Sequence, residues 1–225
     1  FGGYMPNPIS RREWLAGAAG FAAARPAAAS APTAPVVISR CRTYNPSELD
    51  PVLRSSFDKI GGLGKLVKGK TVAIKLNLNG GPYVRLGHLP LGDSHWPHPN
   101  LICSIMRQMN DAGARRIRLL ECGSVNPDEP FEEHLLAANW NPADFTRAGG
   151  RVEFENTNFM GPAKKFARFP VPGGGLLYPA YDLNRSYMDC DVFMTIAKYK
   201  DHPTTGVTLV MKNLFGMTST LVYGE

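Results

Sequence analysis

Strand-like and helix-like segments alternate along most of this chain, and this alternation is the feature that most restricts its fold. Apolar, largely β-branched runs predict strands at residues 36–39, 70–78, 115–121, 149–156 and 190–197. Helical patterns between and around them predict helices within residues 45–62, 98–114, 129–140 and 204–216, with Ser47 as the first N-cap. We therefore expect an α/β fold, a mostly parallel sheet flanked by helices in a Rossmann-like three-layer arrangement. The turn-rich stretch 167–179 predicts a hairpin or an irregular excursion.

Polar residues follow three of the predicted strands where each strand ends. Parallel sheets place ligands beyond the carboxyl ends of their strands, so these residues are candidates for a site. If the three strands are neighbours, the residues converge on one crevice. They are Lys75 and Asn77 at the end of the strand at 70–78, Glu121 and Ser124 at the end of the strand at 115–121, and Lys198, Lys200 and His202 after the strand at 190–197.

Composition excludes one class of function and leaves others open. The chain has 225 residues, 44% of them hydrophobic, which is enough for one core. The formal net charge is +6, but the basic residues are scattered and are not interleaved with aromatic residues. We therefore expect no nucleic-acid partner, and interpret the charge as a solvated surface with a local site for an anion.

The amino-terminal segment, residues 1–31, has the pattern of an export signal. Arg11 and Arg12 precede the mildly apolar run LAGAAGFAAA, and ASA at residues 29–31 fits a cleavage site. SRREWL resembles the twin-arginine (Tat) motif, with Trp14 where Phe is usual. The alternatives are an Ala-rich amphipathic helix and a membrane anchor, although the run is too short for a cleaved segment to span a bilayer. The resemblance implies export of residues 32–225 by the Tat machinery to the periplasm, with no stable membrane span.

Three segments together resemble one protein family: VAIKLNLNGG, HPNLICSIMRQMNDAGARRIRLLECGS and CDVFMTIAKYKDHPTTGVTLVMKNLFG. They are similar to the DUF362 family over residues 72–216, with departures at Leu76, Ala197 and Asp201. The family's function is unknown, so the resemblance implies a fold and a site more than a reaction. Some members have Fe–S modules. The four cysteines here are widely spaced, which does not support a cluster within this chain. Its last residues look like mid-chain sequence, so we expect it to be the N-terminal part of a longer protein.

Lysines in the third segment are the main candidates for binding an anionic small molecule or cofactor. Lys198 and Lys200 are two residues apart and point the same way if the segment is extended. Lysines bind phosphate or carboxylate as point charges, and a desolvated lysine can become a base or nucleophile. The alternative is an edge of solvated lysines. The predicted ligand-binding residues are Lys75, Asn77, Ser124, Lys198, Lys212 and Asn213, and the predicted catalytic residues are His202, Lys200 and Glu121.

A loop with three prolines holds the candidate metal ligands Asp93, His95 and His98. Imidazole and carboxylate groups suit zinc, nickel or iron, but the spacing matches no standard zinc pattern. His98 could instead begin a helix, since Pro99 suits a first helical turn. A metal ion is therefore left open as a cofactor, and no other cofactor is indicated.

These residues leave three functions open. The first is an exported enzyme that holds an anion in a lysine-rich crevice, with or without a metal ion. The second is a redox component paired with an Fe–S module outside this chain. The third is a non-catalytic ligand-binding protein of the cell envelope.

Overall fold

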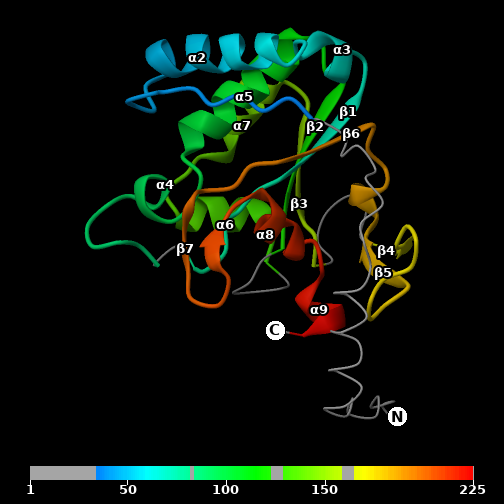
Figure 1. Cartoon of the computed structure of the whole chain (residues 1–225). Helices are drawn as coiled ribbons and strands as arrows, with labels where there is room; N and C mark the ends of the chain where they lie inside the picture. The colour runs from blue at the N-terminus through cyan, green and yellow to red at the C-terminus, as the bar shows by residue number, and fades with distance from the viewer. Residues whose placement is uncertain (1–33, 82–83, 123–128, 159–164, 225) are drawn as a thin grey trace, which may run out of the picture. The chain divides into compact units, whose positions relative to one another are not determined.

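The central feature of the fold is a four-stranded parallel sheet in the order β3-β2-β1-β6 (Figure 1). The computed structural model describes residues 34–81, 84–122, 129–158 and 165–224, and the structural statements below concern these residues. The sheet is made of β1 (Thr71–Lys75), β2 (Arg116–Glu121), β3 (Val152–Asn156) and β6 (Val192–Thr195). In its register, Lys75 lies opposite Leu120 on one side and Thr195 on the other.

Short helices and two hairpins surround the sheet. The helices are α2 (Pro46–Lys59), α3 (Gly64–Val67), α4 (Leu91–Ser94), α5 (Pro99–Asp111), α6 (Phe131–Ala137), α7 (Pro142–Gly149), α8 (Val210–Phe215), α9 (Thr220–Tyr223) and the 3-10 turn η1 (Arg185–Tyr187). The antiparallel hairpins pair β4 (Phe166–Pro170) with β5 (Ala180–Asn184), and β7 (Lys200–His202) with β8 (Gly206–Thr208).

The two faces of the sheet are covered differently, because alternate side chains of a strand point to opposite faces. Val72 and Ile74 of β1 belong to a large apolar core that also contains buried residues of α5, α6 and α7. Ala73 lies in a smaller cluster with Leu183 of β5 and Tyr187 of η1. The larger core is therefore on the helical face, and the smaller one lies under the β4–β5 hairpin (Figure 1).

The predicted α/β fold is confirmed, with local corrections. Residues 36–39 are not a strand, and Asn45 is the N-cap of α2 in place of Ser47, because its side chain accepts from the Ser47 amide. The stretch after Ala197 was expected to be a loop followed by a helix from Thr204. It forms the β7–β8 hairpin first, and α8 begins only at Val210. Gly206, at a φ of 74°, permits the tight turn between these strands.

Residues Val37–Glu225 are grouped as one compact unit. The predicted signal segment, residues 1–31, lies outside the described residues. Of the helices that the structure does describe, none combines the length and the apolar character that crossing a membrane requires.

Candidate functional site

The strand order brings three of the predicted polar clusters to one edge of the sheet. β1 lies between β2 and β6, so the carboxyl ends of these three strands are adjacent. The segment after β1 contains Asn77 and Asn79, β2 ends at Glu121, and β6 leads into Lys198 and Lys200. The expected convergence is therefore observed, and this edge is the candidate site.

Lys75 and Glu121 form a buried ion pair at the base of this edge. Their side chains are 2% and 5% exposed, and the ammonium of Lys75 contacts Oε1 of Glu121. Lys75 Nζ also donates to the Leu76 carbonyl at 2.6 Å. Glu121 accepts from the backbone amides of Leu78 at 2.6 Å and Cys122 at 2.9 Å. The charged groups of Lys75 and Glu121 are thus bonded to each other and to backbone groups at the strand ends. The pair therefore links β1 to β2.

Lys200 is held differently, at the start of β7. Its Nζ donates to the Asn79 Oδ1 atom at 2.9 Å and to the His95 carbonyl at 2.6 Å. Both acceptors are neutral, so they orient the ammonium without cancelling its charge. Burial lowers the pKa of Lys200 to about 8; Glu121 opposes this shift, and Lys198 and Lys212 add to it. Lys200 therefore changes charge near physiological pH.

Lys198, two residues earlier in the same segment, is held by a different acceptor. Its Nζ donates to the Gly92 carbonyl at 2.7 Å and lies 5.6 Å from the centre of the Tyr44 ring. Burial lowers its pKa, and Asp93 opposes the shift. Within the described part of the chain, neither Lys198 nor Lys200 has a carboxylate at ion-pair distance. Two adjacent lysines thus share a partly buried edge with neutral hydrogen-bond acceptors.

Three of the predicted ligand-binding residues have other contacts. Asn77 is 6% exposed and donates to Asn79 Oδ1 at 3.2 Å. Asn213, in α8, is 4% exposed and donates to Thr195 Oγ1 at 2.6 Å, which fixes α8 against the end of β6. Lys212 Nζ lies 5.5 Å from the centre of the Phe215 ring. Asn77 and Asn213 are therefore structural contacts in this conformation, and Lys212 is the more accessible of the three.

His202 ends β7 and its ring is engaged by its own hairpin. Nδ1 accepts from the backbone amides of Thr204 at 3.2 Å and Thr205 at 3.3 Å. These contacts close the turn before Gly206 and leave Nε2 as the protonated nitrogen of the neutral ring. The acid–base role of His202 stays a prediction. Nδ1 is not free for it, because this atom already accepts the two hydrogen bonds of the turn.

The predicted metal ligands lie near the lysines but are not arranged around one point. His98 is the N-cap of α5: its Nδ1 accepts from the Asn100 amide, and its ring stacks on Tyr44 with centroids 4.2 Å apart. Its Nε2 is 3.9 Å from Asp93 Oδ1. Burial lowers the pKa values of both His95 and His98. The described residues contain no group of three or more His, Cys, Asp or Glu that could hold a metal ion.

Comparison with known proteins gives one match. The family model described as "Domain of unknown function (DUF362)" matches residues 72–223. This chain belongs to the DUF362 family. No curated protein and no solved structure matches it significantly. The matched range begins in β1 and ends in α9, so it includes Lys75, Glu121, Lys198, Lys200 and Lys212.

In this DUF362 chain, further buried polar residues follow β3. They were not predicted from the sequence as part of the site. Thr157 and Asn158, which follow β3, are 1% and 0% exposed. Asn158 Oδ1 accepts from Ser219 Oγ at 2.7 Å and from the Cys122 thiol at 2.9 Å. The signal was available, since Thr157 and Asn158 directly follow the predicted strand at 149–156. Ser124, which was predicted with Glu121 at the end of the strand at 115–121, lies outside the described residues.

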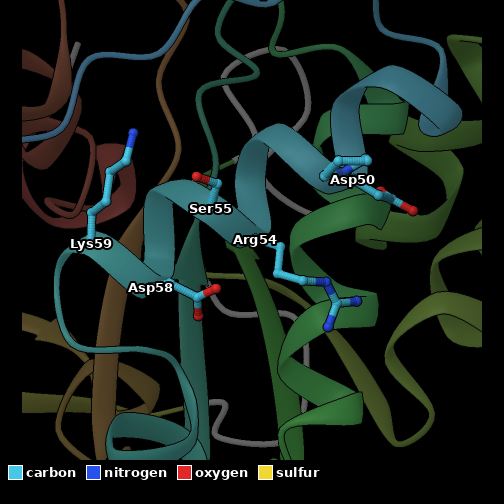
Figure 2. A pocket seen from close by; sticks show the side chains of 6 residues that line it. Asp50, Arg54, Ser55, Asp58 and Lys59 are labelled. Carbon is cyan, nitrogen blue, oxygen red and sulfur yellow. The ribbon is translucent and has the colours of Figure 1, made fainter.

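A surface hollow of about 650 Å³ lies elsewhere on the DUF362 chain, along α2. Figure 2 shows its lining side chains, with Lys59 pointing away from Arg54. Asp50 there pairs with Arg107 of α5 at 2.7 Å. None of the predicted site residues lines this hollow. Its charges do not converge, so we assign the candidate site to the strand ends.

Proposed function

We propose that this chain is an exported protein that binds an anionic small molecule or cofactor at the carboxyl edge of its sheet. Lys198, Lys200 and Lys212 supply the positive charge. The observation that supports this most is that the ammonium groups of Lys198 and Lys200 donate to neutral oxygens. A cation kept partly out of water without a carboxylate partner costs free energy, and a bound anion would recover it.

The base of the site supports the same proposal. Lys75 and Glu121 neutralise each other, so they define the strand ends without attracting an anion. The net positive charge is therefore concentrated in the segment from Lys198 to Lys212. Lys200, whose pKa is about 8, is also the residue we propose for proton transfer if the ligand reacts.

Isothermal titration calorimetry tests the binding. The probes are pyruvate, citrate and inorganic phosphate, titrated into wild type and into Lys198→Met, Lys200→Met and Lys212→Met. We expect at least one probe to bind, and each substitution to weaken it by roughly tenfold to a hundredfold, the usual value of a charge-assisted hydrogen bond. Lys65→Met is the matched control, because it removes the same charge from the exposed surface of α3.

The controls decide between outcomes. If Lys65→Met weakens binding as much as Lys200→Met does, the effect is net charge and the proposed site is wrong. If none of the three probes binds wild type, the anion-binding function is overturned for these classes. Circular dichroism of each variant excludes unfolding as the cause.

Export through the Tat pathway rests on residues 1–31, with Arg11 and Arg12 as the decisive pair. Changing both to Lys is expected to retain the protein in the cytoplasm of a bacterium that has this pathway. Fractionation followed by immunoblotting measures this, and unchanged export would contradict the proposal.

A further inference from the structure

The hydrogen bonds of Lys200 leave one direction of its amino group unassigned. A lysine ammonium has three N–H donors. Two of them are directed at Asn79 Oδ1 and the His95 carbonyl, at 2.9 and 2.6 Å. Asn79 follows β1 and His95 follows α4, so the nitrogen is held by two different segments of the chain. When the third proton leaves, the lone pair occupies the remaining direction while the two hydrogen bonds persist.

The surroundings of Lys200 favour loss of that proton. Its pKa is lowered to about 8, mainly by burial and also by Lys198 and Lys212, while Glu121 opposes the shift; His95, whose own pKa is lowered, is a further titratable neighbour. At pH 7.5 a lysine with this pKa is in its neutral form far more often than an ordinary lysine is. Neutral amines are the nucleophilic form. The neighbouring lysines keep the site positive after Lys200 has lost its proton.

We propose that Lys200 is a nucleophile that forms an imine with the carbonyl carbon of a 2-oxo carboxylic acid. This inference rests on the anion-binding function proposed above and names its ligand class. The carboxylate of such an acid would pair with the positive charges of Lys198 and Lys212. In a 2-oxo acid the carbonyl carbon is directly bonded to that carboxylate. An acid of this kind brings its electrophilic carbon to the one amine that is both oriented and neutral.

The reaction balances without an added oxidant or cofactor. The Lys200 Nζ lone pair adds to the carbonyl carbon, and one proton of the amine moves to the carbonyl oxygen to give a carbinolamine. The hydroxyl then leaves as water with the second amine hydrogen, and a C=N bond forms. One proton from solvent gives the iminium, which pairs with the carboxylate of the same ligand.

Reductive trapping tests the proposal. The protein is incubated with pyruvate and cyanoborohydride at pH 7.5, and the product is analysed by intact mass and by peptide mapping. We expect one adduct per chain, located on Lys200 and formed at least about tenfold faster than on Lys65, because the lowered pKa of Lys200 gives it more of the neutral amine than an ordinary lysine has. Lys200→Arg is expected to lose this adduct and to keep only slow labelling of surface lysines.

Two further measurements separate this inference from general amine reactivity. Acetaldehyde, which lacks a carboxylate, is expected to lose the preference for Lys200. The rate of adduct formation with pyruvate at Lys200 is expected to rise with pH and to level off near pH 8. Equal labelling of Lys200 and Lys65, or none at Lys200, overturns the inference.

The result also distinguishes the two proposals. If pyruvate binds by calorimetry and binding depends on Lys198 and Lys200, but no adduct forms, only the imine is wrong. If pyruvate neither binds nor reacts, and citrate and phosphate also fail to bind, the proposed function is overturned with it. Peptide mapping of the wild type decides the matter even if Lys200→Arg does not fold.

Discussion

Two lysine environments at one edge of the sheet differ in what holds the ammonium group. At the base, Lys75 contacts Glu121 and is 2% exposed. At the rim, Lys198 and Lys200 are half-buried and donate to carbonyl and amide oxygens. The first lysine has its counter-charge inside the protein, and the other two have none at ion-pair distance within the described residues. The base thus contributes to stability, and the rim is where we propose that a ligand binds.

The comparison is energetic as well as geometric. A buried ion pair is expensive to break, because one partner is left charged and unsolvated. A half-buried lysine held by neutral acceptors destabilises its own charged form, as the lowered pKa of Lys200 indicates. Substitution should therefore affect stability at the base and ligand binding at the rim.

The largest expected effect is on stability at the base. Lys75→Met leaves Glu121 buried without its cation, and we expect the free energy of unfolding to fall by about 3–5 kcal/mol. Urea denaturation monitored by circular dichroism measures the change. The double variant Lys75→Met, Glu121→Gln removes both charges and should be less destabilised than Lys75→Met. If the free energy of unfolding of Lys75→Met falls by less than about 1 kcal/mol, the base does not contribute more to stability than the rim does, and the comparison is wrong.

The sequence was sufficient to predict a parallel sheet with polar residues at its strand ends, but not which strands are neighbours or how the lysines there are paired. Alternating apolar runs and helices determine a parallel sheet, and a parallel sheet aligns carboxyl ends. Lys75 was predicted to bind a ligand because it ends a strand like the others. Its partner Glu121 is 46 residues away, and only the register that puts Lys75 opposite Leu120 brings them together. Such long-range pairing leaves no local pattern.

The rim was harder to predict for a different reason. Residues 198–209 were expected to be a loop followed by a helix, since TTGVTLVMKNLFG contains good helical spacing. The β-branched residues Val207 and Thr208, next to Gly206, favoured a hairpin instead. The hairpin places Lys200 opposite Thr208 and fixes its direction, which an irregular loop would not have done.

The second expected effect is on the pH dependence of binding at the rim. Because the pKa of Lys200 is lowered to about 8, the residue is charged below that pH and neutral above it. The affinity for inorganic phosphate should therefore fall by about tenfold between pH 7 and 9, beyond any change due to phosphate itself. Lys200→Arg stays charged throughout and should lose this fall. Calorimetry at several pH values measures both proteins, and equal slopes would show that Lys200 is not the titrating group.

The smallest expected effect concerns His202, which lies at the rim but has the local contacts of a structural residue. His202→Ala removes the acceptor for the Thr204 and Thr205 amides, so we expect a loss of about 0.5–1 kcal/mol in the free energy of unfolding, the low end for a partly exposed hydrogen bond. His202→Asn is the matched control, because an Asn oxygen can accept from the same turn and should restore most of the stability. Both variants should bind phosphate within about twofold of wild type, since the His202 ring is engaged by its own turn and His202 is not one of the lysines that we propose to hold the anion. Urea denaturation and calorimetry on the same samples measure the two quantities together. If a variant keeps its stability but loses phosphate binding, His202 contacts the ligand and does not mainly stabilise the turn. The binding site at the rim would then include His202 as well as the lysines.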